Sequence, residues 1–133
     1  MHITQHTDYA LRVLILLALR KEKVTIAQIA EHFAISQDHL RKVVHRLGML
    51  GYVKTARGKQ GGLTLAMAPA QVNVGQVLRD FEPHFDMVEC FNARTNHCAL
   101  FPECGLQGAL REATARFLAT LDGYTLADLL HAR

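Results

Sequence analysis

The sequence TIAQIAEHFAISQDHLRKVVHRLGMLGYVKTARGKQGGLTL, residues 25–65, decides the fold. Thr25 and Gln28 have the spacing of a capping box, and an apolar face follows them, so a short helix is predicted to begin here. After a tight connection, Ser36 is placed to cap a longer helix that ends near Leu50. Two helices joined by so short a link predict a helix-turn-helix unit.

The longer helix is predicted to have one apolar and one polar face. Its buried side is formed by apolar residues spaced three and four apart: Leu40, Val43, Val44 and Leu47. Its polar side carries Gln37, His39, Arg41, Lys42, His45 and Arg46. An α-helix fits the major groove of DNA, where side chains of this kind hydrogen-bond to base edges. We therefore expect this helix to contact DNA.

A basic β-hairpin follows. Residues 52–55 (YVKT) and 63–65 (LTL) are predicted to be its strands, and the loop between them contains RGKQGG at 57–62. Lys and Arg at such a tip release counterions from the phosphate backbone, and glycines let the main chain approach phosphates closely. The hairpin is the expected wing of a winged helix-turn-helix.

Signals on both sides of this unit complete the predicted fold. Thr7 is expected to cap a first helix over 7–20, with Asp8 in the first turn, where the helix dipole favours an anion. The downstream pattern predicts a short helix ending before Pro83, an irregular segment over 84–104, a long helix from about Gly105 to Leu121, and a terminal piece, Leu126–Leu130, capped by Thr125.

The expected fold class is therefore mainly α with a small β-hairpin. Residues 1–68 are expected to form a winged helix-turn-helix DNA-binding domain, 69–104 a linker helix and a cluster-binding loop, and 105–133 a dimerisation helix and a terminal helix. These parts are expected to form a single compact chain, with the first helix shared with the dimer interface.

Composition limits the classes of protein that fit. The chain has 133 residues, 50% of them apolar, with 9 Gly and 3 Pro, as expected of one folded domain. No apolar run approaches the roughly 20 residues of a membrane span, and we see no signal peptide. We expect a cytoplasmic protein with no membrane partner. It is not expected to be an enzyme, because nucleophile, metal-hydrolase and nucleotide-loop patterns are lacking.

Charge is divided unevenly along the chain. Residues 1–66 hold ten Lys/Arg and four Asp/Glu, whereas residues 67–133 hold five and eight. The basic half predicts a polyanionic partner, double-stranded DNA. Base or near-base contacts are assigned to Gln37, His39 and Arg41, and phosphate or groove contacts to Ser36, Lys42, His45, Arg57 and Lys59. A merely solvated face and a plain hairpin turn are the alternatives.

A single small domain reads only a few base pairs, so a homodimer on two half-sites is expected. The long helix over 105–121 has an apolar stripe too broad for a lone surface helix, and it is the expected dimer element. The alternative is that this helix packs only within its own subunit.

Three cysteines, Cys90, Cys98 and Cys104, lie within fifteen residues and favour a metal or cluster site over a disulfide framework. The close Cys pair usual at zinc sites is lacking, and the longer gaps suit an iron–sulfur cluster with one position left for another ligand. His84 and His97 are alternative ligands. An electron carrier, or a regulator based on zinc or thiol oxidation, also remains open.

Several motifs together carry a close resemblance to the bacterial Rrf-two (Rrf2) family of winged-helix regulators, and within it to the nitric-oxide-sensing repressors. They are Thr7–Arg12 (TDYALR), Tyr52-Val53, Arg57–Gly62, Glu82-Pro83, the three cysteines and Leu121–Leu129 (LDGYTLADL). The similarity covers almost the whole chain.

This resemblance implies a homodimeric repressor that binds palindromic operator DNA and responds to nitric oxide. It implies one iron–sulfur cluster per subunit, 4Fe–4S or alternatively 2Fe–2S, held by the three cysteines and by Asp8 of the partner subunit. The family branch that regulates cluster biogenesis has a shorter first cysteine gap and a histidine where this chain has Gln107. An iron-responsive or redox-status regulator of the same family is the remaining alternative.

Overall fold

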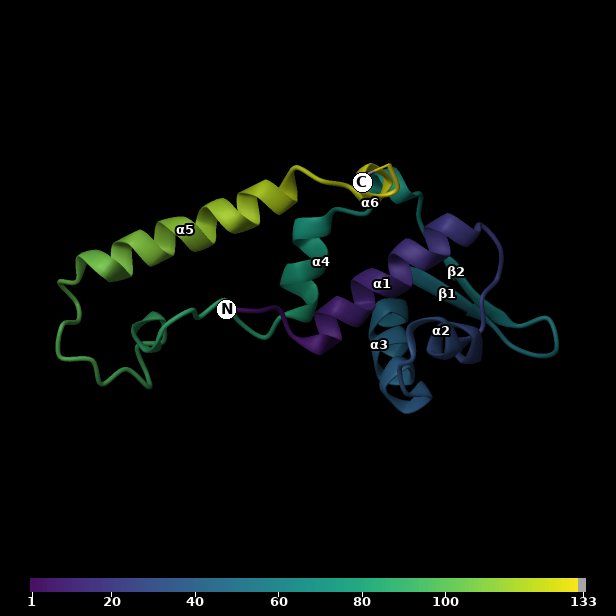
Figure 1. The fold of residues 1–133 in the computed structure, drawn as a ribbon, viewed down its shortest axis with the longest axis horizontal. Helices are drawn as coiled ribbons and strands as arrows, with labels where there is room; N and C mark the ends of the chain where they lie inside the picture. Colours follow the sequence, from purple (N-terminus) through teal and green to yellow (C-terminus); the bar gives the residue numbers. More distant parts are fainter. Residues whose placement is uncertain (132–133) are drawn as a thin grey trace.

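The computed structural model describes residues 1–131. The helices and strands are α1 (Gln5–Arg20), α2 (Ile26–Phe33), α3 (Gln37–Met49), β1 (Val53–Ala56), β2 (Gly62–Leu65), α4 (Val74–Phe81), α5 (Gly105–Asp122) and α6 (Leu126–Leu129), with short 3-10 turns at Pro69–Gln71 and Glu89–Phe91. Figure 1 shows a compact body built from α1, α2, α3 and the hairpin, and a long α5 that extends away from it. The predicted class, mainly α with one hairpin, is confirmed. No helix among the described residues is long and apolar enough to cross a membrane.

α1 is the centre of the core. Ala10, Val13, Leu14 and Leu17 are almost fully buried, because α1 packs against α3, α4, β2 and α6. Burial of each large apolar side chain contributes about 1.5–3 kcal/mol. Because α1 is covered on so many sides, nearly all of its faces carry apolar residues, as its sequence shows.

The predicted start of α1 is wrong by one turn. Thr4, not Thr7, is the N-cap, and its Oγ1 accepts from the Thr7 backbone N–H at 3.3 Å. Thr7 lies inside the first turn and is fully buried. Both residues are threonines with cap propensity, so local preference could not separate them. Asp8 remains in the first turn, as predicted.

The two helices of the helix-turn-helix, α2 and α3, begin directly after their predicted capping residues, Thr25 and Ser36. The Thr25 capping box is formed, with Gln28 N–H donating to Thr25 Oγ1 at 3.1 Å and Thr25 N–H donating to Gln28 Oε1 at 2.9 Å. Ser36 caps α3 by accepting from His39 N–H at 3.2 Å. The buried side of α3 is the predicted one: Leu40, Val43, Val44 and Leu47.

β1 and β2 are antiparallel, with Val53 opposite Leu65 and Ala56 opposite Gly62. A bridge between Val24 and Leu63 ties the hairpin to the chain just before α2. Each strand differs from its prediction by one residue. Tyr52 is buried just before β1. Its carbonyl oxygen accepts from Ala66 N–H at 2.9 Å, and its hydroxyl donates to Asp80 on α4 at 2.5 Å.

α5 contrasts with the body because none of its residues is buried, and its main packing partner within the chain is α4. The short helix before Pro83 and the capped piece after Thr125 are both present as α4 and α6. No residue between 82 and 125 is buried. The chain therefore consists of a packed half and a sparsely packed half that α4 connects.

Glu82, directly after α4, binds the start of α1. Its carboxylate accepts from Thr4 Oγ1 and Thr7 Oγ1, both at 2.6 Å, and from Thr4 N–H at 3.1 Å. Burial alone would raise the pKa of Glu82, but these hydrogen bonds outweigh burial and hold the pKa below its usual range. The charged form is therefore the one that joins α1 to α4.

Glu82→Gln should lower the free energy of unfolding by about 2 kcal/mol at neutral pH, since hydrogen bonds to a charged group are lost. Because the folded pKa is depressed, the contribution of Glu82 is complete above its unfolded pKa of about 4.3 and disappears as pH falls through the lower folded pKa. Denaturant unfolding at neutral and acidic pH should show wild type and variant converging in acid. The exposed control Glu22→Gln should match wild type throughout; a constant gap for Glu82→Gln would contradict the assignment.

Candidate nucleic-acid interface and cysteine segment

One face of α3 is open to solvent. Ser36, Gln37, Arg41, Lys42 and His45 are exposed along it. They come from the first three turns of the helix, and the buried positions that alternate with them hold α3 against the core. The structure therefore brings together five of the six predicted contact residues of the helix-turn-helix.

The sixth, His39, is half-buried. Its ring meets the Tyr9 ring edge-on, with centroids 4.8 Å apart. Tyr9 in turn lies beneath the guanidinium of Arg12, which also lies over Phe33. His39 thus serves the packing of α1 on α3 as well as the exposed face. Only its place in the TDYALR motif marked Tyr9 in the sequence.

Arg41 is held in a local polar cluster. Its guanidinium donates to Asp38 Oδ1 at 2.6 Å and to Gln37 Oε1 at 3.3 Å. All three side chains are exposed, so these contacts are weak and exchangeable for a base or phosphate.

Arg46 has a different role from the rest of the polar side of α3. It donates to the Asp80 carbonyl oxygen from Nε at 3.2 Å and from Nη2, and it lies over the Phe81 ring. Arg46 therefore joins α3 to α4. Asp80 also accepts from Tyr52, and burial together with this bond raises the pKa of Tyr52. Sequence reasoning missed Asp80, because no local pattern marks it.

The wing presents Arg57 and Lys59 at an exposed tip. Gly58 has φ +96°, and Gly61 has no room for a side chain, since a Cβ would lie 2.5 Å from the Ala56 carbonyl oxygen and 2.9 Å from that of Gly58. Lys23 Nζ donates to the Gln60 carbonyl oxygen at 3.4 Å from the base of the hairpin. The glycines thus set the path of the tip that carries the basic side chains.

The three cysteines lie on the irregular segment before α5. Cys90 is in the 3-10 turn, Cys98 in the loop, and Cys104 is the N-cap residue of α5. All three are free thiols and partly exposed. Within residues 1–131, no three His, Cys, Asp or Glu side chains are gathered closely enough to hold a metal ion.

Few contacts fix this segment. Gln107 Nε2 donates to the Cys90 carbonyl oxygen at 3.1 Å, and the guanidinium of Arg111 lies 4.4 Å from the centre of the Phe91 ring. Both partners come from the first half of α5. Three unpaired thiols on one weakly packed segment are a donor set that suits soft, thiolate-bound iron. Ligation would require the segment to draw together.

Asp8 lies apart from the cysteines. Its carboxylate accepts from Arg12 Nε at 3.0 Å and from Nη2 at 2.7 Å, and its side chain is 38% exposed. In Figure 1 the start of α1 and the cysteine segment lie well apart. His84 and His97 are both exposed, and His84 Nδ1 accepts from Asp86 N–H at 3.1 Å.

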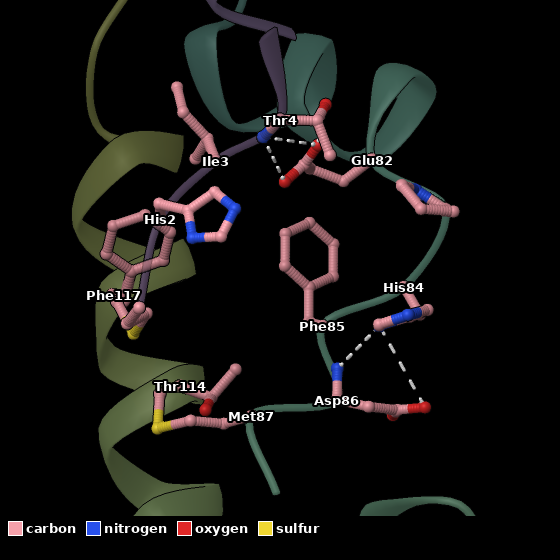
Figure 2. A pocket seen from close by; sticks show the side chains of 12 residues that line it. His2, Ile3, Thr4, Glu82, His84, Phe85, Asp86, Met87, Thr114 and Phe117 are labelled. Carbon is pink, nitrogen blue, oxygen red and sulfur yellow. Dashed lines mark hydrogen bonds and ion pairs between the residues drawn. The ribbon is translucent and has the colours of Figure 1, made fainter. Parts of the chain in front are cut away.

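A groove of about 650 Å³ separates α5 from the N-terminal residues and from the chain after α4. Figure 2 shows Thr114 and Phe117 on the α5 side, Phe85 pointing into the space, and the bonds from Thr4 to Glu82 at one end. The middle of α5 is therefore separated from the body along this side.

The fold and the exposed polar face agree with comparisons to known proteins. Residues 3–132 match the Rrf2 family, described as iron-dependent transcriptional regulators. The chain belongs to the Rrf2 family. It is 52% identical to the HTH-type transcriptional regulator NsrR of Bacillus subtilis over 132 residues, covering 98% of this chain and 90% of that one. It is 50% identical to NsrR of Geobacillus kaustophilus, covering 100% and 92%.

Solved Rrf2-type structures share the fold. The structure is similar to CymR, the global cysteine regulator of B. subtilis, with a TM-score of 0.79 and 26% identity, covering 98% of this chain and 96% of that one. It is similar to T. potens IscR with a TM-score of 0.76 and 25% identity, covering 98% and 86%. The chain is thus a transcriptional regulator with a DNA-binding winged helix. The prediction that it is not an enzyme is confirmed by this membership.

Gly61→Ala should reduce affinity for operator DNA by roughly tenfold, the scale of one lost contact. The added Cβ meets backbone oxygens that cannot move aside, so the tip must change its path. Fluorescence anisotropy with labelled DNA measures the effect. Gly48→Ala, where a Cβ meets nothing within 4 Å, is the matched control and should bind normally. Equal binding by both variants would show that the tip does not touch DNA.

Proposed function

We propose that this regulator is a homodimeric, nitric-oxide-responsive repressor in which an iron–sulfur cluster controls operator binding. The observation that carries the proposal is the placement of three free thiols on a weakly packed segment at the end of an unburied helix. Identity of about half of the residues to regulators named NsrR supports it.

α3 and the wing supply the DNA contacts in this proposal. Gln37, His39 and Arg41 read bases from the N-terminal part of α3, which is the part that enters the major groove in helix-turn-helix proteins. Ser36, Lys42, His45, Arg57 and Lys59 contact phosphates or the groove edge. All five are exposed, and the positive charges of Lys42, Arg57 and Lys59 suit that role.

α5 supplies the dimer contact. It has no buried residue within its own chain, and Leu106 is 65% exposed. Exposed apolar side chains on a helix are stabilised when a second copy covers them. Two copies then present two α3 helices to half-sites about one helical turn, or 34–36 Å, apart on palindromic DNA.

Cys90, Cys98, Cys104 and the partner subunit's Asp8 would hold the cluster, 4Fe–4S or alternatively 2Fe–2S, one per subunit. When bound, it supplies iron that reacts with nitric oxide. To serve as a ligand, Asp8 would give up its ion pair with Arg12, an exposed pair four residues apart on a helix and worth only about 0.5 kcal/mol. An oxygen ligand suits soft, thiolate-bound iron less well than a thiolate does, so Asp8 would be the weakest of the four ligands.

As a ligand, Asp8 would connect α1 of one subunit to the cysteine segment of the other, and its loss would remove that connection. α1 packs on α3, so the separation of the two α3 helices then no longer matches the operator. A mismatch of a few kcal/mol is enough to lose specific binding. Repression ends, and the target genes are expressed.

Arg41→Ala and Lys59→Ala should affect DNA binding differently. Arg41→Ala should cost about 1–3 kcal/mol on the operator and relax the base preference at one position. Lys59→Ala should weaken binding to all sequences and reduce the slope of log affinity against log salt by about 1. Titrations on operator and random DNA at several salt concentrations measure both. Arg116→Ala on α5 is the control and should change neither; similar losses for all three would indicate only a net-charge effect.

Protein purified anaerobically should be brown and contain iron, and nitric oxide should bleach the cluster spectrum in parallel with DNA release. Cys98→Ser should abolish the cluster. Asp8→Asn should retain it in a more labile form with poorer control of DNA release, whereas His97→Ala should behave as wild type. Absorption spectra and iron analysis measure the cluster in each variant, and gel shifts measure its DNA binding.

Colourless protein loaded with zinc would favour a zinc- or thiol-based regulator instead. A cluster-bearing protein that ignores nitric oxide but responds to iron supply would favour an iron-responsive member of the family. Tight DNA binding without the cluster, unaffected by the gas, would refute the proposal.

A further inference from the structure

The C-terminal end of α5 is joined to α4 by polar contacts that neither DNA binding nor cluster ligation uses. Arg79 on α4 donates from Nη1 and Nη2 to the two carboxylate oxygens of Asp122, the last residue of α5, with Nη2–Oδ2 at 2.9 Å. Asn73 Nδ2 donates to the Asp122 carbonyl oxygen at 2.8 Å. The side chain and the backbone of Asp122 are therefore both fixed to α4.

Gly75 shows how closely the two helices approach. A methyl group on Gly75 would overlap the Asp122 carboxylate and lie 2.9 Å from both Cγ and N of Asp122. Gly75 is buried in the first turn of α4. The absence of a side chain at this position is what lets Asp122 reach Arg79.

α5 is a long arm that starts from this contact. Its 18 residues span about 27 Å, none is buried, and the groove of about 650 Å³ separates its middle from the body. At the far end Cys104 occupies the N-cap position, while Gln107 and Arg111 contact the chain around Cys90. A small rotation at Asp122 therefore produces a large displacement of the cysteines.

The same α4 is fixed to the DNA-reading helix. Asp80, next to Arg79, accepts from Arg46 of α3 through its carbonyl oxygen and from Tyr52 through its carboxylate. Two adjacent residues of α4 thus make the two connections: Arg79 contacts α5, and Asp80 contacts α3 and the residue before β1.

We infer that Arg79, Asp122 and Gly75 form a positioning joint that sets the angle between α5 and the winged helix. Through α4, this joint transmits the state of the cysteine segment to α3 of the same chain. The inference rests on the proposed function. The side chains of Arg79 and Asp122 are 38% and 40% exposed, and such pairs add little to stability, so their geometry is the property that matters.

The test compares DNA affinity with and without the cluster, in full-length dimers. Wild type should show a large ratio of the two affinities, whereas Asp122→Asn and Gly75→Ala should each reduce the ratio roughly tenfold, within the usual range of site-to-site coupling. Iron content, the cluster spectrum and dimer mass should stay close to wild type for both variants. The melting temperature should stay close to wild type for Asp122→Asn and fall for Gly75→Ala, because the added Cβ would lie 2.9 Å from the backbone N of Asp122. Gly75→Ala changes no charge, so a shared phenotype identifies geometry as the cause.

Glu112→Gln is the matched control. It removes an exposed ion pair with Arg116 (2.7 Å) that lies within α5 and does not touch α4, and it should keep the wild-type ratio. If Asp122→Asn does not fold, the ratio of DNA affinities with and without the cluster is measured for Gly75→Ala and Arg79→Lys instead. Lysine keeps the charge of Arg79 but cannot make the paired hydrogen bonds to Asp122.

The two levels of the hypothesis fail in different ways. A wild-type protein whose DNA affinity is independent of the cluster overturns the proposed function and this inference with it. A wild-type ratio that the joint variants retain overturns the inference alone. A ratio lost only together with the cluster or the dimer assigns these residues a structural role and also overturns it.

Discussion

The apolar side chains of α1 are removed from water by α3, α4, β2 and α6 together. This shared burial is the constraint on which the rest of the structure depends, because each of those elements reaches its position by covering part of one helix. α3 can expose its polar face because its apolar face packs against α1. The hairpin is oriented in the same way, through the burial of Leu63.

Polar contacts then connect this core to a half of the chain that has little core of its own. They concentrate at α4: Glu82 binds the start of α1, Asp80 binds Arg46 and Tyr52, and Arg79 binds the end of α5. Apolar burial holds an element in place over a wide range of small displacements, whereas paired hydrogen bonds fix distance and direction. α4 is thus suited to hold a defined angle between two parts that differ in packing.

Much of the fold was accessible from the sequence because it is encoded locally. The Thr25 capping box, the Ser36 cap and the apolar spacing of α3 act over three or four residues, and all appear in the structure. The start of α1 was missed because Thr4 and Thr7 have equal local propensity, and the contact that both hydroxyls make with Glu82, 75 residues beyond Thr7, leaves no local signal.

The candidate site was only partly accessible for the same reason. The exposure of Arg41 and Lys42 follows from the helical periodicity of α3, and that of Lys59 from its place in the hairpin turn. Both could be predicted. The burial of His39 against Tyr9 and the use of Arg46 by Asp80 depend on long-range packing. The cysteine spacing singled out the segment that carries the three free thiols. The relative positions of thiols on an irregular segment are not encoded in any local pattern.

The close approach at Gly75 also bears on how such a chain can diversify. Positions 75 and 122 are far apart in sequence yet share one space, so a larger residue at 75 requires a shorter one at 122. One residue inserted into α5 would turn everything beyond it by about 100° around the helix axis and move Asp122 off Arg79. Insertions are far better tolerated in the irregular stretch between the first two cysteines. Drift in cysteine spacing, beside a helix of constant length, is the evolutionary signature that this architecture predicts.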